Sequence, residues 1–176
     1  RNIASSKDWK GRKSPWIGTK NIWKLFYLSG LLKEDTFNKI QSMKPKDWNY
    51  EFSDYVYDEI KENKIFITNL GKCTQLDARP LSNEVLKKYL NLLLKELDIV
   101  KPKIIITFGN QVSSIILNKK ISVSSNRKEC HYLKINNNKY KVYPVYYPVG
   151  NGIFNMDKAI EDIKWIIENE LENIRK

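Results

Sequence analysis

Two short apolar runs rich in β-branched residues, Lys64–Thr68 and Lys103–Phe108, enclose a leucine-rich segment. Runs of this length and composition are typical of buried strands. The segment between them has the spacing of a helix: Ser82 can cap it, Glu84 suits its first turn, and Pro102 ends it. Its apolar stripe is Leu86, Leu90, Leu93 and Leu97. Strands that alternate with helices in this way predict a mainly parallel sheet.

Helical spacing also marks the N-terminal half of the chain. Ile22–Leu28 has apolar residues on one face, and Gly30 stands where this helix is expected to stop. Residues 33–50 lack a clear period and are expected to be irregular, whereas Asp54–Glu62 favours a short helix. Residues 1–20 are basic and polar and are expected to form a loop.

The C-terminal half continues the alternation of strands and helices. Gly109 is expected to turn the chain into a helix through Val112, Ile115 and Ile116, and residues 119–131 to form a loop. Asn136-Asn137-Asn138 predicts a hairpin turn between Tyr132–Ile135 and Lys139–Tyr147. A last helix is expected from about residue 155. Its predicted buried face is Met156, Ile160, Ile163, Ile167, Leu171 and Ile174.

This pattern predicts the α/β class, as a three-layer α/β/α sandwich with a central, mainly parallel sheet of roughly four strands. A chain of 176 residues is most simply a single domain over residues 1–176, with a first strand expected upstream of residue 1. Such sheets bind ligands at the carboxyl ends of their strands. The loops after Thr68, Phe108 and Tyr147 are therefore the expected functional loops.

Composition narrows the class of partner. The net charge of +11 favours an anionic partner such as nucleic acid, although a lysine-, asparagine- and isoleucine-rich chain also arises from an AT-rich genome. No apolar run approaches the roughly 20 residues of a membrane helix. No signal peptide is recognisable, so we expect a cytoplasmic, nucleoid-associated monomer of prokaryotic or viral origin. Two cysteines, Cys73 and Cys130, and one histidine, His131, disfavour disulfides and a zinc site.

The first segment with a recognisable pattern combines Lys10-Gly11-Arg12, Pro15-Trp16-Ile17-Gly18, Asn21-Ile22-Trp23 and Ser29-Gly30-Leu31. It resembles the mismatch-specific and thymine-DNA glycosylase branch of the uracil-DNA glycosylase superfamily. It is also similar to the Pro-Phe-Val-Gly of the thermostable iron–sulfur branch. In both branches an aromatic residue stacks on the flipped uracil. The resemblance implies this role for Trp16, with Trp9 as the nearest competitor.

The second segment is Ile67-Thr68-Asn69-Leu70-Gly71-Lys72-Cys73, which resembles the Ile-Thr-Asn-Val-Val-Lys-Cys of the iron–sulfur branch. There the asparagine reads the uracil edge, so the resemblance implies that Asn69 is the base reader. An amide offers a donor and an acceptor in one plane, which fits O4 and N3–H of uracil and disfavours cytosine. The alternatives are an Asn69 that only caps a loop and a Lys72 that is only a solvated or helix-end lysine.

The third segment is Tyr147-Pro148-Val149-Gly150-Asn151-Gly152, where the superfamily has His-Pro-Ser or Asn-Pro-Ser-Gly. The residue before Pro stabilises the leaving uracil or orients water, so the resemblance implies a catalytic role for Tyr147. Val149 cannot replace the serine hydroxyl. The loop that follows inserts an apolar wedge into DNA, and its implied DNA contacts are Gly150, Asn151 and Ile153. Phe154 is the alternative wedge, and both apolar residues have the alternative of a core position at the start of a helix.

Two departures from the superfamily concern its cluster and its water-activating residue. Cys73 matches the third of four cluster cysteines, but Tyr89 stands at the fourth position and no N-terminal pair precedes it. We therefore expect no metal and no cofactor, with Cys73 as a small buried residue. The water-activating residue follows the first strand, and counting back from Lys10 places Asn2 there. Asp8 is an alternative acid, and a residue upstream of this chain is the third possibility.

The resemblance as a whole implies a monofunctional DNA glycosylase of base excision repair that removes uracil or a related deaminated base. Uracil-containing DNA is the implied partner, and the candidate phosphate contacts are Lys13, Lys20, Lys72 and Arg79. One alternative is a glycosylase-like fold that binds nucleic acid or a nucleotide without hydrolysis. Another is a nucleoside or nucleotide hydrolase on the same fold. The choice depends on the site, since a fold alone does not fix a function.

Overall fold

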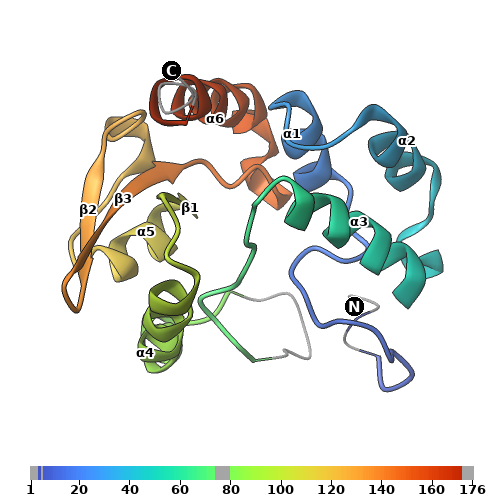
Figure 1. Cartoon of the computed structure of the whole chain (residues 1–176), viewed down its shortest axis with the longest axis horizontal. Helices are drawn as coiled ribbons and strands as arrows, with labels where there is room; N and C mark the ends of the chain where they lie inside the picture. Colours follow the sequence, from blue (N-terminus) through green and yellow to red (C-terminus); the bar gives the residue numbers. More distant parts are fainter. Residues whose placement is uncertain (1–3, 5, 74–79, 172–176) are drawn as a thin grey trace. The chain divides into compact units, whose positions relative to one another are not determined.

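The computed structural model describes residues 4, 6–73 and 80–171, and the chain divides into two units, 1–80 and 81–176 (Figure 1). None of the helices in the described residues combines the length and apolarity needed to cross a membrane. The expectation of one domain over residues 1–176 stays a prediction.

Unit 1 is helical in its described residues. Its elements are α1 (Asn21–Leu28), α2 (Glu34–Ser42), the 3-10 turn η2 (Pro45–Asp47) and α3 (Tyr50–Glu62). The helix predicted at Ile22–Leu28 is confirmed, and Gly30 follows it with φ 76°, a conformation that glycine adopts without strain. The helix predicted at Asp54–Glu62 is confirmed but begins earlier, because Asn49 caps it by accepting a hydrogen bond from Phe52 N at 2.8 Å.

The expectation that residues 33–50 are irregular was wrong, because α2 lies within them. This helix has no capping side chain of its own. Instead, the buried Glu59 of α3 accepts hydrogen bonds from Lys33 N at 2.6 Å and from Thr36 Oγ1 at 2.5 Å. The backbone N–H of Lys33, the residue before α2, is therefore satisfied by a side chain 26 residues away in the sequence, which no local pattern reveals.

An aromatic cluster forms the core of unit 1 around Trp23, which is fully buried. The Trp48 ring stacks on it at 6.4 Å between centroids, and Tyr57 and Phe26 approach it at 5.6 Å. Aromatic pairs at these separations add to the free energy of burial. The start of α1 is thus rigidly attached to α3 through large side chains.

The strand predicted at Lys64–Thr68 is not a strand in the structure. Residues 65–69 have no regular secondary structure, and Phe66 is 50% exposed. A strand needs a neighbour to pair with, and the described residues of unit 1 contain no strand that could supply one. The segment nevertheless leads out of α3 directly to Asn69.

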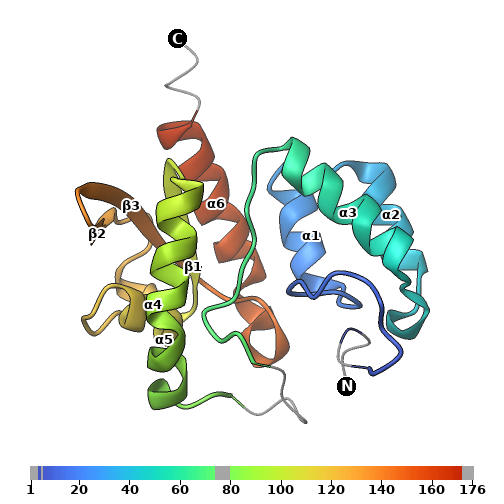
Figure 2. The ribbon, with the colours of Figure 1, turned by 60° about the horizontal axis from the view of Figure 1, so that its bottom comes forward.

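Unit 2 holds the sheet. Its elements are α4 (Asn83–Val100), β1 (Ile104–Phe108), α5 (Asn110–Ile116), η3 (Val123–Ser125), β2 (His131–Ile135), β3 (Asn138–Val145), η4 (Gly150–Asn155) and α6 (Met156–Glu170). Figures 1 and 2 show α4 and α5 on one side of the sheet and α6 on the other, so unit 2 has three layers. Trp165 of α6 packs on Tyr143 of β3, with ring centroids 6.3 Å apart.

The sheet corrects the prediction of roughly four mainly parallel strands. The described residues form three strands in the order β1-β3-β2, with β1 and β3 parallel and β2 and β3 antiparallel. The antiparallel pair follows from the two-residue turn at Asn136 and Asn137, where Asn136 has φ 52°. The predicted hairpin is confirmed, whereas the strand predicted at Lys64–Thr68 is absent from the sheet of the described residues. In the described sheet β1 is an edge, and its three isoleucines are half-buried rather than buried.

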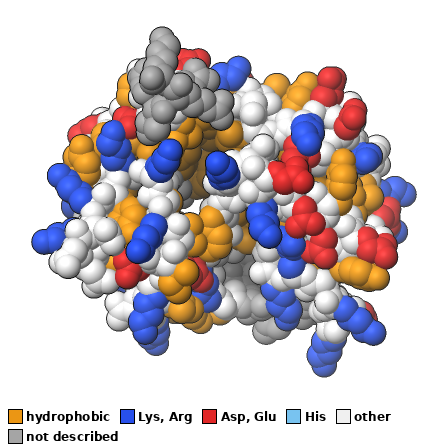
Figure 3. Space-filling view, in the orientation of Figure 1, with side chains coloured by type: hydrophobic (Ala, Val, Ile, Leu, Met, Phe, Trp, Pro, Cys, Tyr) orange, Lys and Arg blue, Asp and Glu red, His pale blue; other side chains and the backbone are white. Residues whose placement is uncertain are grey.

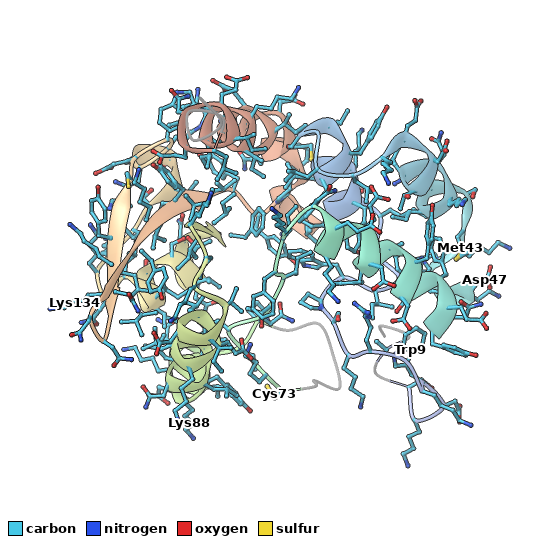
Figure 4. The ribbon with its side chains drawn as sticks, in the orientation of Figure 1. Trp9, Met43, Asp47, Cys73, Lys88 and Lys134 are labelled. Carbon is cyan, nitrogen blue, oxygen red and sulfur yellow. The ribbon has the colours of Figure 1, made fainter. Side chains whose placement is uncertain are left out.

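The outer side of the hairpin is basic. Tyr132 and Lys134 of β2 are exposed, and Lys134 lies directly opposite Lys139 of β3. The Lys139 ammonium sits 3.8 Å from the centroid of the Tyr132 ring, a cation–π contact. In Figure 4 Lys134 projects outward from β2.

The helices of unit 2 test the predicted apolar stripes. In α4, Ser82 accepts from Val85 N at 3.4 Å as the predicted cap, and the stripe is buried apart from the half-buried Leu90. In α6 the predicted face is partly wrong, because Ile160 and Ile167 are half-buried while Ala159 and Ile166 are buried. The buried face also includes the fully buried Asp162, a polar residue that pairs with Arg127 and that an apolar pattern does not reveal. Ile174 lies outside the described residues.

Candidate functional site

The loop before α1 is fastened to α3. Arg12 Nε lies 2.6 Å from Asp54 Oδ1, and its guanidinium is 5.1 Å from the centroid of the Tyr57 ring. Trp9 Nε1 donates to the carbonyl of Arg12 at 3.0 Å. At Gly11 a Cβ would stand 2.7 Å from Tyr50 Cβ, so only glycine fits. The loop is therefore held in one conformation, and Trp9 has a structural task within it.

Trp16 lies in the turn that follows, with φ 66°. Positive φ is rare for a bulky residue and marks a strained turn. The half-buried indole meets the rings of Trp23 and Phe26 at centroid distances of 6.3 and 5.9 Å, edge to face in both cases. One part of the ring thus packs on the core of unit 1 while another part stays accessible. This is the geometry that a stacking platform requires.

Asn69 ends the extended segment after α3 and is exposed. Among the described residues no hydrogen-bond partner is found for its amide. The nearby Lys72 is half-buried, and its ammonium donates to Thr68 Oγ1 at 2.5 Å. Asn69 therefore presents an amide to solvent, while Lys72 has a task within its own segment.

The carboxyl ends of the parallel pair in unit 2 both carry aromatic side chains. Phe108 ends β1 and Tyr147 follows β3, and their ring centroids are 6.0 Å apart at an angle of 47°. Tyr147 is 38% exposed. Tyr147 was predicted to be the last residue of its strand, but β3 ends at Val145, so Tyr147 lies in the segment that follows. Phe108 was missed as a member of the same cluster. Its position immediately before Gly109, at the end of an apolar run, was the available signal.

The loop after Tyr147 is tight. Val149 N donates to the Tyr147 carbonyl at 2.9 Å, and Gly152 N donates to the Val149 carbonyl at 3.1 Å. Gly150 has φ 58°. Gly150 and Asn151 are exposed, as contacts to DNA must be. The backbone of this loop is thus compact and open to a large ligand on the side of these two residues.

The two candidate wedge residues differ in exposure. Ile153 is half-buried, whereas Phe154 is 91% exposed, the highest value of any large apolar side chain in the described residues. An aromatic ring held so fully in water is unfavourable unless a partner covers it. Exposure favours Phe154 over Ile153 as the apolar contact.

The remaining predicted residues are placed as follows. Lys13 and Asp8 are exposed. The ammonium of Lys20 donates a hydrogen bond to the Gln41 carbonyl. Asn2 and Arg79 lie outside the described residues. Trp16 and Asn69 belong to unit 1, whereas Tyr147 and the loop that follows it belong to unit 2.

Charge is unevenly distributed over the surface of unit 1. Figure 3 shows acidic side chains gathered over α3, whose exposed residues include Glu51, Asp58 and Glu62. Such a face repels phosphate. The net positive charge of the chain therefore does not make every face a nucleic-acid surface.

An iron–sulfur cluster does not fit these 176 residues. A cluster needs four thiolate ligands, and the chain has two cysteines. Cys73 (labelled in Figure 4) is exposed rather than buried, which corrects its prediction. The Cys130 thiol donates to the carbonyl of His131 at 3.6 Å. In the part of the chain that the structure describes, no three His, Cys, Asp or Glu side chains are placed to hold a metal ion.

Comparison with known proteins agrees with the residues that carry the resemblance. The family model described as the uracil DNA glycosylase superfamily matches residues 9–162. A Type-4 uracil-DNA glycosylase of Sulfurisphaera tokodaii is 25% identical over 121 residues, which is 66% of this chain and 52% of that protein. The chain thus spans about half the length of this curated relative. The match to the family model includes the loop around Trp16, the segment around Asn69 and the loop after Tyr147. The chain belongs to the uracil DNA glycosylase superfamily.

Proposed function

We propose that the protein is a monofunctional DNA glycosylase of base excision repair that removes uracil or a related deaminated base from DNA. The observation that carries the proposal is the exposed amide of Asn69, which ends a segment similar to the base-reading segment of the superfamily. The proposal also draws on Trp16, whose ring is half-buried in a strained turn.

Recognition begins with extrusion of the target nucleotide, because the glycosidic bond is inaccessible inside the stack. The indole of Trp16 then stacks on the base, a contact on the order of 1–3 kcal/mol. Asn69 donates its amide N–H to O4 and accepts from N3–H. Cytosine has the opposite pattern of donor and acceptor at these two positions, so it is rejected.

The chemical step is hydrolysis. A water oxygen forms a bond to C1′, the bond from C1′ to the base nitrogen breaks, and the electron pair leaves with uracil as an anion. Of the two candidates in this chain, the Asp8 carboxylate can accept the proton of the water, whereas the Asn2 amide can only orient the water, whose proton then passes to solvent. The hydroxyl of Tyr147 donates a hydrogen bond to the leaving uracil anion and keeps its proton. Fixed donors of this kind stabilise developing charge without a metal or a nucleophilic lysine.

DNA is held by its phosphates and by the loop after Tyr147. Lys13 is an exposed candidate for phosphate contact, with Lys20, Lys72 and Arg79 as the other candidates. Gly150 and Asn151 bring the backbone close to DNA. Phe154, rather than Ile153, enters the space that the extruded nucleotide leaves, because it is the exposed member of the pair.

The test is an assay for base release. The protein is incubated with oligonucleotides that carry uracil, hypoxanthine or a thymine mismatch, and abasic sites are then cleaved with alkali. Strand scission at uracil that falls at least tenfold in Asn69→Ala and in the isosteric Asn69→Asp supports the proposal. Asn91→Ala, at an exposed asparagine of α4, is the matched control and should retain the rate. Binding without scission on any substrate would contradict the enzyme.

A second candidate function is binding of nucleic acid or a nucleotide without hydrolysis. Val149 favours it, because the superfamily's serine hydroxyl is absent from the loop. The same assay distinguishes the two. A non-hydrolysing protein would bind uracil-containing DNA in an Asn69-dependent way and leave the glycosidic bond intact.

A further inference from the structure

We infer that Trp23 and Thr19 are positioning residues for Trp16, which hold the indole in place for stacking on the extruded base. The inference rests on the proposed function and adds the residues that orient the platform. Neither residue contacts the base in this account. Both act through the carbonyl of Trp16, which belongs to the peptide group that follows it.

The carbonyl of Trp16 accepts three hydrogen bonds. Thr19 donates its backbone N–H at 3.1 Å and its hydroxyl at 2.7 Å, and Trp23 donates Nε1–H at 3.2 Å. A carbonyl oxygen has two lone pairs, so these donors saturate it. The plane of the peptide that follows Trp16 is thereby fixed.

The peptide that precedes Trp16 is fixed as well. Its carbonyl belongs to Pro15 and accepts a hydrogen bond from the hydroxyl of Tyr57 in α3. Tyr57 is buried, which raises the pKa of its phenol and keeps the hydroxyl protonated as a donor. With both peptide planes held, the two backbone dihedrals of Trp16 have no freedom.

This restraint explains how a bulky residue keeps φ 66°. Glycine takes positive φ without strain, as Gly18 does two residues later with φ 75°. Among the non-glycine residues with positive φ in the described part of the chain, Trp16 is the one with an aromatic side chain. The strain at Trp16 is therefore tolerated at a position that presents an aromatic ring. Strain of this kind is characteristic of binding sites whose surroundings fix the backbone.

Trp23 suits the role because it is immobile. It is fully buried, it sits on α1, and the rings of Trp48, Tyr57 and Phe26 surround it. Its only polar atom points at the Trp16 carbonyl. Its ring also meets the Trp16 indole at nearly a right angle, with the centroids 6.3 Å apart. The Trp16 side chain is thus held in place by its contacts with the rigid core of unit 1.

The experiment compares two substitutions of the same kind in one cluster. Trp23→Phe removes the donor to Trp16, whereas Trp48→Phe removes an indole N–H for which the described residues offer no partner. Trp48 is 2% exposed and stacks on Trp23, so both changes disturb the core to a similar degree. The readouts are single-turnover release of uracil, affinity for DNA with an abasic site, affinity for DNA with a hydrolysis-resistant 2′-fluoro-deoxyuridine, and the melting temperature.

We expect Trp23→Phe to slow base release and weaken affinity for the fluoro-nucleotide by roughly three- to tenfold. Affinity for abasic DNA should stay unchanged, because no base is present to stack on Trp16. Thr19→Val should have the same effect, and Thr19→Ser, which keeps the hydroxyl, should restore the wild-type values. Trp48→Phe should leave unchanged the ratio of the affinity for fluoro-nucleotide DNA to the affinity for abasic DNA.

Equal effects of Trp23→Phe and Trp48→Phe on that ratio would overturn the inference. So would a parallel loss of affinity for abasic DNA, which indicates a structural role alone. If Trp23→Phe fails to fold, the comparison of Thr19→Val with Thr19→Ser decides. A wild-type protein that releases no base contradicts the proposed function instead, and the ratio of affinities still tests the positioning.

Discussion

A Cβ added to Gly152 would stand 2.0 Å from the carbonyl oxygen of Tyr147. Two heavy atoms cannot approach so closely, and the opposing atom belongs to the backbone, so a side chain at this position forces the loop apart. The turn that follows β3 therefore depends on the hydrogen atom of Gly152. The position of Tyr147 and that of the exposed Phe154 are both coupled to it.

Gly152→Ala should destabilise the protein by about 1–3 kcal/mol, as overpacking does, and lower base release at the same time. Gly30→Ala is the matched control, because its φ of 76° strains the backbone while no atom lies within 4 Å of the added methyl. Thermal unfolding and the oligonucleotide assay measure both effects. A melting temperature of Gly152→Ala equal to that of the wild type would show that the loop relaxes without cost, and one no lower than that of Gly30→Ala would show no penalty from the contact with the Tyr147 carbonyl.

Phe154→Ala should reduce the rate of uracil release from double-stranded DNA by about tenfold while leaving stability unchanged, because the ring is 91% exposed and packs on little. Release from single strands should fall less, since no base stack has to be held open. Ile99→Ala removes another side chain that is 82% exposed, on α4, and should change neither rate. A matching loss on single- and double-stranded substrates would contradict a wedge at Phe154.

The single histidine predicts a loss of stability in mild acid. Burial, and then the Lys119 ammonium 2.9 Å from Nδ1, lower the pKa of His131 below 6.5, and Glu129, 3.9 Å from Nε2, opposes them weakly. The unfolded chain therefore binds this proton more tightly than the folded one. The contribution of His131 to the free energy of unfolding is therefore fully present above about pH 6.5 and is lost as the pH falls below that value.

Nuclear magnetic resonance can follow this group directly, because the chain has one histidine. Lys119→Met should raise the pKa of His131 and make the acid-induced loss of stability shallower. Lys120→Met, at the exposed neighbouring lysine, should do neither. An imidazole that titrates at or above 6.5 in the folded wild type would contradict the prediction.

Asp162→Asn should destabilise unit 2 by about 3 kcal/mol, because it leaves the Arg127 guanidinium beside a buried neutral group. Arg127 Nε lies 3.0 Å from both carboxylate oxygens of the fully buried Asp162. Urea unfolding measures the loss, with Glu168→Gln on the exposed side of α6 as the control. The double variant Arg127→Met with Asp162→Leu should recover most of it, and a double variant no more stable than Asp162→Asn would contradict this account.

The sequence predicted the elements whose causes are local. Ser82, the leucine stripe of α4 and the asparagine turn at Asn136 act on their own neighbours, and all three were recognised. The cap of α2 was not, because Glu59 reaches it from another helix. The strand at Lys64–Thr68 failed for a related reason, since strand formation depends on a partner strand that the apolar pattern does not specify.

The site divides in the same way. Tyr147 and Asn69 follow from motifs, and their solvent exposure agrees with a role in binding. The sequence could not decide between Ile153 and Phe154, because the choice depends on which of the two side chains η4 exposes to solvent. The sequence also could not predict that Thr19 and Trp23 donate to the Trp16 carbonyl. These hydrogen bonds depend on the turn in which Trp16 has positive φ, and no sequence pattern indicates that turn.

The lysines of the β2–β3 hairpin bear on how the protein behaves when it is concentrated. In the sheet of the described residues β2 is an outer strand, with Lys134 already opposite Lys139. If β2 of a second copy joined this side, it would bring its own Lys134 to the sheet, and like charges across a strand pair repel. The hairpin thereby resists growth of the sheet into fibrils, and this protection should weaken as salt screens the lysines.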